Sequence, residues 1–208
     1  MYMVFAQPGV PTEVAVLAAA WSQIRTSISE QSILEVGTGR CIASTRFGIG
    51  VLGVLGIKSR ALPCSLTVWN GLAYDLSTRN VPMVEWPALA WSLGVAADEK
   101  PIGRVWDAHL CIEWKGENGQ SGILDLDLPL YTRPQYGINL MATALAWPDR
   151  ERRMLHSESD SGEHVLWVAA RHLTRFRLSE EWTIPPDKEE LNVAANTVKR
   201  LCTELADT

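Results

Sequence analysis

A cysteine directly after a glycine-rich turn is the first feature of this chain that could do chemistry. Cys41 follows Gly37-Thr38-Gly39-Arg40 and precedes an apolar run, 42–57, that indicates a helix. A turn that feeds a helix leaves backbone N–H groups unpaired at the helix start, and these groups stabilise nearby negative charge. Cysteines in such positions commonly have a pKa of about 3.5 to 7.5. The pattern predicts that Cys41 is a nucleophile, and the alternative is an inert buried thiol.

Thiol catalysis also needs a base that takes the thiol proton and a third group that orients the base. His109 lies on the polar face of an alternating segment, 106–114, and Asp125 lies on the polar face of a second one, 123–128. Such alternation indicates two half-buried strands. Asn118-Gly119 between them is typical of a hairpin turn.

The register of this hairpin decides which carboxylate meets the histidine. A hairpin folded about Glu117 places His109 opposite Asp125, with the Cβ atoms about 4.5 to 5.5 Å apart. A turn shifted by one residue places Asp127 opposite His109 instead, and periodicity alone does not choose between them. We predict a triad of Cys41, His109 and Asp125.

Composition limits the class of protein. The chain has 208 residues, of which 47% are apolar, enough for a single domain over 1–208 with a substantial core. A net charge of -5 and the lack of a Lys/Arg run argue against nucleic acid and anionic membranes as partners. No segment is apolar enough to span a membrane, and a signal peptide is not indicated. Four cysteines without Cys-x-x-Cys spacing predict a reduced, cytoplasmic protein.

Hydrophobic periodicity predicts the elements that position these residues. We expect a packing helix over 14–28, a strand over 62–69, a further strand over 165–169, a solvated loop over 148–163 and an amphipathic C-terminal helix over 186–206. Residues 71–105 form a long connection of the kind that often serves as a lid or excursion. Its Trp91, and Trp106 just beyond it, are candidates for lining a substrate groove, although such tryptophans can equally pin a connection to the body.

The helix predicted after Cys41 has glycines at Gly48, Gly50 and Gly53. Each costs about 1 kcal/mol relative to alanine in a helix interior. That cost suggests that another backbone packs closely against the helix.

Several short motifs together resemble a known family. The run Gly39-Arg40-Cys41, followed by Leu55-Gly56-Ile57-Lys58-Ser59-Arg60, resembles the signature of transglutaminase-like proteins in the papain-like superfamily. Ala108-His109-Leu110 and Leu124-Asp125-Leu126 fall at the spacing of the family's histidine and aspartate. Ala90-Trp91-Ser92-Leu93-Gly94 and the stretch from Asp125 to Arg133-Pro134 are similar to uncharacterised bacterial and phage members, which favours Asp125 over Asp127.

The resemblance covers residues 37–137 and implies an α+β fold in which a central helix packs on an antiparallel sheet. It also implies a cysteine hydrolase or acyltransferase with Cys41, His109 and Asp125 as catalytic residues. Two features depart from the family: Leu110 replaces the usual aromatic residue, and no side chain is evident for the oxyanion hole. Gln31 is a weak candidate for that role, and the backbone N–H of Cys41 is another.

The predicted function is thiol-dependent acyl transfer from a peptide or small acyl substrate to water or an amine, with no cofactor and no metal. One alternative is a binding module that has lost turnover. Another is an S-adenosylmethionine-dependent methyltransferase, because Ile33 to Gly39 resembles the first motif of that class. A structural zinc site lacks paired ligands, although Cys41, His109 and Asp125 could bind a metal adventitiously. Asp127 remains a possible substrate or oxyanion residue.

Overall fold

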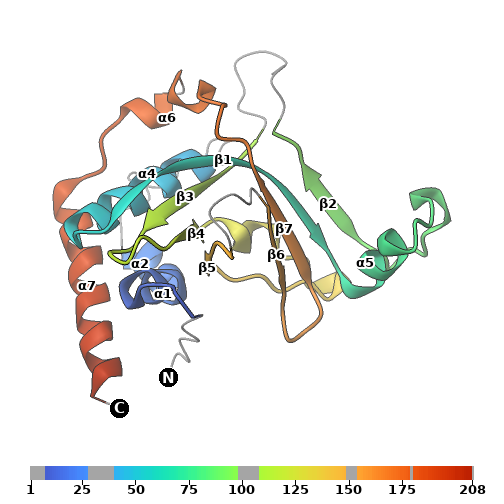
Figure 1. The fold of residues 1–208 in the computed structure, drawn as a ribbon, viewed down its shortest axis with the longest axis horizontal. Helices are drawn as coiled ribbons and strands as arrows, with labels where there is room; N and C mark the ends of the chain where they lie inside the picture. Colours follow the sequence, from blue (N-terminus) through green and yellow to red (C-terminus); the bar gives the residue numbers. More distant parts are fainter. Residues whose placement is uncertain (1–7, 28–39, 98–107, 149–153, 179, 208) are drawn as a thin grey trace.

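One curled antiparallel sheet forms the centre of the protein (Figure 1). The computed structural model describes residues 8–27, 40–97, 108–148, 154–178 and 180–207. The strands are β1 (Lys58–Trp69), β2 (Ser92–Val95), β3 (His109–Lys115), β4 (Ser121–Asp125), β5 (Thr143–Ala146), β6 (Met154–Glu158) and β7 (His164–Ala169). Their order is β5-β4-β3-β1-β7-β6, and β2 pairs with β1 beyond the end of β3. The predicted α+β class is confirmed.

Every pair of neighbouring strands in the described part of the chain is antiparallel. Doubly wound folds bind their cofactors at the carboxyl ends of parallel strands. The observed sheet therefore does not provide the framework that the methyltransferase alternative requires.

Four of the described helices gather at one side of the sheet (Figure 1). They are α1 (Thr12–Ala19), α2 (Trp21–Ser27), α4 (Arg40–Val54) and α7 (Lys188–Ala206), whereas α5 (Gly71–Thr78) lies at the opposite end of the molecule. Shorter helical segments are η1 (Met83–Glu85), η2 (Leu128–Tyr131), η3 (Pro134–Tyr136), η4 (Arg175–Leu178) and α6 (Glu180–Thr183). Among the described helices, none combines the length and hydropathy that crossing a bilayer requires.

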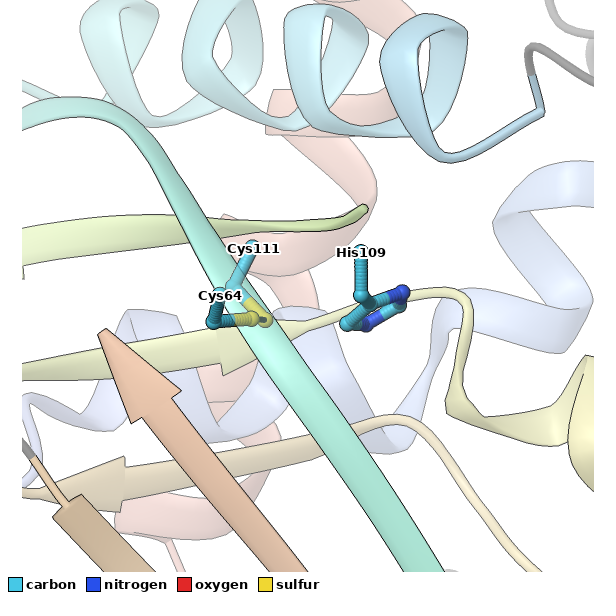
Figure 2. Close-up of side chains that lie close together, drawn as sticks. All are labelled: Cys64, His109 and Cys111. Atoms are coloured by element: carbon cyan, nitrogen blue, oxygen red, sulfur yellow. Dashed lines mark hydrogen bonds between the residues drawn. The ribbon is translucent and has the colours of Figure 1, made fainter. Parts of the chain in front are cut away.

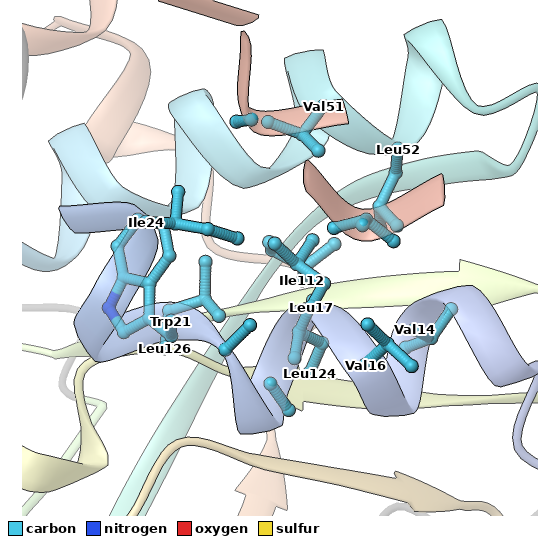
Figure 3. Packing of buried hydrophobic residues seen from close by; sticks show 14 of the residues in the cluster. Val14, Val16, Leu17, Trp21, Ile24, Val51, Leu52, Ile112, Leu124 and Leu126 are labelled. Carbon is cyan, nitrogen blue, oxygen red and sulfur yellow. The ribbon is translucent and has the colours of Figure 1, made fainter. Parts of the chain in front are cut away.

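The first hydrophobic core lies between these helices and the sheet (Figure 3). Leu17 and Trp21 reach it from α1 and α2, Leu52 from α4, and Ile112 and Leu124 from the sheet. All five side chains are almost fully buried. The helix that carries Cys41 is thus held firmly against strands β3 and β4.

The second hydrophobic core lies on the other face of the sheet. Successive side chains of a strand point to opposite faces, so His109 and Cys111 of β3 face away from Leu110 and Ile112. Cys111 joins a cluster that includes Leu62, Cys64 and Trp167. The curl of the sheet encloses this second core.

Some predicted elements differ in detail. The predicted first helix is interrupted at Ala20 between α1 and α2, and β6 occupies part of the predicted loop over 148–163. The connection over 71–105 contains α5, η1 and β2, so it returns to the sheet and extends it. The predicted C-terminal helix is present as α7, and the Asp187 side chain caps it by accepting hydrogen bonds from two backbone N–H groups.

The hairpin folded about Glu117 is wrong, and the structure has the alternative turn that is shifted by one residue. Ile112 pairs with Leu124, so the turn is centred on Asn118 and not on Glu117. The reason is the connection between the strands: Gly116 N–H donates to Gln120 O, and Gly119 adopts a left-handed conformation with φ of 72°. This register pairs Cys111, not His109, with Asp125.

The three glycines of α4 have different surroundings. A Cβ atom on Gly48 would lie 2.4 Å from Ile112 Cδ1 and 2.7 Å from Leu126 Cδ1, and one on Gly50 would lie 2.7 Å from Leu191 of α7. A Cβ atom on Gly53 would meet nothing within 4 Å. Packing is close at Gly48 and Gly50, but side chains make the contacts, so the expectation that another backbone approaches the helix is wrong at all three glycines.

This contrast predicts opposite effects for two substitutions in one helix. Gly48→Ala should lower the free energy of unfolding by about 1–3 kcal/mol, because the added methyl group overpacks the first core. Gly53→Ala should leave it unchanged or raise it by up to about 1 kcal/mol, because alanine favours the helix. Urea denaturation of both variants measures the difference, and equal effects would contradict the close approach at Gly48.

Candidate active site

The site is built around a buried pair of ionisable groups. His109 begins β3 and Asp125 ends β4, and neither side chain is exposed. His109 Nε2 lies 2.7 Å from Asp125 Oδ2. Because the register pairs Asp125 with Cys111, the imidazole reaches the carboxylate diagonally across the two strands. The structure thus brings together the predicted histidine and aspartate by a geometry other than the predicted one.

Four donors satisfy the Asp125 carboxylate. Oδ2 accepts hydrogen bonds from His109 and from Trp167 Nε1 at 2.8 Å, and Oδ1 accepts from the backbone N–H groups of Asp127 and Leu128, each at 3.1 Å. Burial alone would raise the pKa of Asp125, but the charge on His109 and these hydrogen bonds lower it. Asp125 is therefore ionised at neutral pH.

The pairing with Asp125 also sets the direction of the pKa shift of His109. Burial disfavours the charged imidazole, but the charge and hydrogen bond of Asp125 outweigh burial and raise the pKa of His109 to about 9. The other ring nitrogen, Nδ1, lies 3.3 Å from the hydroxyl of Tyr131. Both ring nitrogens therefore have hydrogen-bond partners, and the imidazole carries a proton on each at neutral pH.

Cys41 lies next to this pair, in the first turn of α4. Strand β4 ends at Asp125, so the backbone groups of Leu110 that face that side have no ladder partner. Two α4 side chains take their place: Thr45 Oγ1 donates to Leu110 O at 3.0 Å, and the Cys41 sulfur accepts from the backbone of Leu110. The thiol is thus fixed beside the residue that follows His109.

The ring nitrogens of His109 face Asp125 and Tyr131 in this arrangement. Among the described residues no hydrogen bond joins Cys41 to His109, because Asp125 and Tyr131 occupy the ring nitrogens. Burial raises the pKa of Cys41 well above its usual value, and the carboxylates of Asp127 and Asp125 add to this effect. The expectation of a lowered thiol pKa is therefore wrong for the resting arrangement, since one backbone hydrogen bond does not offset burial and two nearby acids.

Asp127 has a separate place in the site. It follows the end of β4, and its Oδ1 accepts a hydrogen bond from Ser44 Oγ of α4 at 2.8 Å. Burial and the neighbouring Asp125 charge raise its pKa to about 7, against the opposing effect of the Ser44 hydrogen bond. Asp127 links α4 to the end of β4 and changes charge near neutral pH.

Of the remaining predicted residues, the structure describes Trp91, which has other partners. Trp91 stacks on Tyr136 at 5.9 Å between ring centroids, and its backbone N–H donates to Asn70. It therefore anchors the connection after β1, as the alternative interpretation held. Gln31 and Trp106 lie outside the described residues.

Sequence reasoning missed three contributors: Ser44, Tyr131 and Trp167. Tyr131 follows the predicted strand closely, but nothing in its spacing indicates a contact with His109. Trp167 lies in the segment predicted as a late strand, and its role depends on β7 pairing with β1. Comparisons with protein-family models, curated proteins and solved structures find no match for this chain.

The pairing predicts a pH dependence for His109. Replacing Asp125 by asparagine removes the charge that raises the imidazole pKa, and burial then dominates. The pKa of His109 should fall from about 9 to 6.5 or below. NMR titration of the imidazole measures this shift, with Asp127→Asn as the control that produces a smaller one. An unchanged pKa in Asp125→Asn would contradict the assigned ion pair.

The Trp167 hydrogen bond predicts a pH-dependent loss of stability. Trp167→Phe should lower the free energy of unfolding by about 1–3 kcal/mol at pH 6, because a buried carboxylate loses a donor. A depressed carboxyl pKa stabilises the fold above the ordinary value of 3.8 and loses this contribution as the pH falls. The cost should therefore shrink in acid.

Trp147→Phe is the matched control for this measurement. Trp147 is also nearly buried in the second core, but its Nε1 has no hydrogen-bond partner in the described part of the chain. Guanidinium denaturation at pH 6 and at pH 3 should show a pH-dependent cost for Trp167→Phe and a pH-independent one for Trp147→Phe. Parallel pH profiles for the two variants would refute the role given to Trp167.

Proposed function

We propose that this protein is a thiol-dependent acyl-transfer enzyme of papain-like, transglutaminase-like type, in which Cys41 is the nucleophile. The observation that carries the proposal is the buried His109–Asp125 hydrogen bond of 2.7 Å, whose carboxylate is close enough to Cys41 to raise the pKa of the thiol. A base held by a carboxylate next to a thiol is the arrangement that thiol catalysis uses. The antiparallel sheet with α4 packed against it agrees with such a fold.

The roles follow from the positions of the three groups. The Cys41 sulfur attacks an amide or ester carbonyl and forms a thioester, and His109 donates a proton to the leaving group. Water or an amine then attacks the thioester, with His109 accepting its proton. Asp125 keeps the imidazole oriented and stabilises its charge. The backbone N–H of Cys41, in the first turn of α4, is a donor for the developing oxyanion.

The contact between Tyr131 and His109 has to break before the reaction can begin. The Tyr131 hydroxyl occupies Nδ1 at 3.3 Å, a long hydrogen bond that a small displacement breaks. Once Tyr131 moves, the imidazolium can approach the thiol and stabilise its thiolate. The Cys41–His109 pair then loses one proton together, so its apparent pKa belongs to the pair and not to either group.

Alkylation of the four cysteines tests the nucleophile. Cys202 is partly buried like Cys41, whereas Cys64 and Cys111 are buried, so Cys202 is a matched thiol in the same chain. As the pH rises from 6 to 9, iodoacetamide should modify Cys41 about 10-fold or more faster than Cys202, and His109→Gln should remove this advantage. Mass spectrometry of peptides resolves each site.

Acyl transfer itself is tested with p-nitrophenyl acetate. Wild-type protein should acquire an acetyl group on Cys41 and release p-nitrophenol over many turnovers, whereas Cys41→Ser should not, and Cys202→Ser should behave as wild type. If Cys41 reacts no faster than Cys202 and no acetyl adduct forms, the proposal fails. The binding-module alternative then becomes the better account of the site.

A further inference from the structure

A second group of reactive side chains lies directly behind the histidine. Cys64 of β1 pairs with His109 of β3, and Cys111 is the next residue of β3 on the same face. The two sulfur atoms lie 3.4 Å apart, and one ligand atom from each of the three residues lies within 4.8 Å of the others. Figure 2 shows the two thiols together beside the imidazole. We propose that Cys64, Cys111 and His109 bind a thiophilic divalent metal ion, with Zn²⁺ as the best match.

The ligand types favour such an ion. Two cysteines and one histidine form a common zinc set, and a three-ligand set leaves the fourth position of a tetrahedral ion open. Zn–S bonds of about 2.3 Å in tetrahedral geometry place two sulfurs about 3.8 Å apart. The observed sulfur separation therefore has to increase by only a few tenths of an ångström. Asp125 hydrogen-bonds to His109 and lies beside Cys111, so a carboxylate adjoins the site.

Binding releases one proton from each ligand. The ion replaces the S–H protons of Cys64 and Cys111, and the proton on the ligating nitrogen of His109 also leaves to solvent. Two thiolates then neutralise the charge of a divalent cation, which matters because all three side chains are at most 1% exposed. The Asp125 carboxylate loses its imidazolium partner and is stabilised by its hydrogen bonds from Trp167 and from the backbone of Asp127 and Leu128.

Metal binding removes His109 from the proposed triad. Nε2 now contacts Asp125 and Nδ1 contacts Tyr131, so an ion bound through either nitrogen displaces one of these partners. The nitrogen that binds the ion can no longer exchange a proton. The metal site itself does not depend on the proposed function, but its effect does: where Cys41 is a nucleophile, the bound ion inhibits it.

The test uses the Cys41→Ser chain, which lacks the only other cysteine placed beside the start of β3 in the described structure. Co²⁺ is the probe, because thiolate ligands give it charge-transfer bands and tetrahedral geometry gives it visible d–d bands. The chain is incubated with Co²⁺ for hours, and a second sample is refolded with Co²⁺, since the cluster is buried. We expect one Co²⁺ per chain with both sets of bands, and their loss when Zn²⁺ is added.

Matched variants assign the ligands. In the Cys41→Ser background, Cys64→Ala and Cys111→Ala should each weaken the bands by half or more, whereas Cys202→Ser should leave them unchanged. If the folded Cys41→Ser chain shows no thiolate bands by either route, the two cysteines are apolar core groups and the proposal is wrong. This first result needs no core variant, so poor folding of Cys64→Ala cannot obscure it.

A last measurement separates this inference from the proposed function. Zn²⁺ should slow iodoacetamide modification of Cys41 at least 10-fold in wild-type protein and much less in Cys64→Ala. Cobalt binding without any reactivity of Cys41 would support the metal site and refute the acyl-transfer function. Equal protection of Cys41 by Zn²⁺ in Cys64→Ala would mean that Cys41 itself binds the ion, which would overturn the ligand assignment.

Discussion

The His109–Asp125 ion pair imposes the strictest requirement on this structure, because two charges without solvent contact are stable only when their remaining polar atoms are satisfied. Asp125 meets the requirement with donors from three sources: the histidine, the backbone after β4, and the indole of Trp167. Trp167 can reach the carboxylate only if β7 lies beside β1 and the sheet curls. The stability of the His109–Asp125 pair, formed by β3 and β4, therefore depends on the position of β7, a strand late in the chain.

The same requirement explains why the end of β4 matters. The chain turns away after Asp125, which points two backbone N–H groups at the carboxylate and leaves Leu110 paired with β1 but with no residue of β4. Helix α4 fills the place that a continued strand would take, through Thr45 and Cys41. A helix that was displaced along the strand would leave backbone groups of Leu110 unpaired in the interior. The thiol position is thus set by the backbone of the sheet, with the packing at Gly48 fixing the distance.

The sequence predicted the class of fold from local periodicity. It predicted the pairing of His109 with Asp125 from a family resemblance, because periodicity left Asp125 and Asp127 as alternatives. It did not predict the hairpin register. The observed five-residue connection and a shorter turn both fit the alternation of polar and apolar residues in the two strands, and the two registers differ by one step. Tyr131, Trp167 and the Cys64–Cys111 contact were also missed. The two cysteines are separated by 47 residues, and only the pairing of β1 with β3 brings them together. Contacts of this kind follow from strand order, which hydrophobic pattern does not encode.

The charges around Cys41 explain why its reactivity has to be conditional. Asp125 and Asp127 both oppose a thiolate, the backbone hydrogen bond from Leu110 favours it, and the His109 imidazole is held by Asp125 and Tyr131. Asp127 titrates near pH 7, so rising pH adds a second negative charge just as solution conditions begin to favour thiol ionisation. Ser44 limits this effect by stabilising the Asp127 charge through a hydrogen bond. In the proposed function, a thiolate therefore forms only when the imidazolium moves toward the sulfur, and this movement, more than the pH of the solution, sets when the thiol reacts.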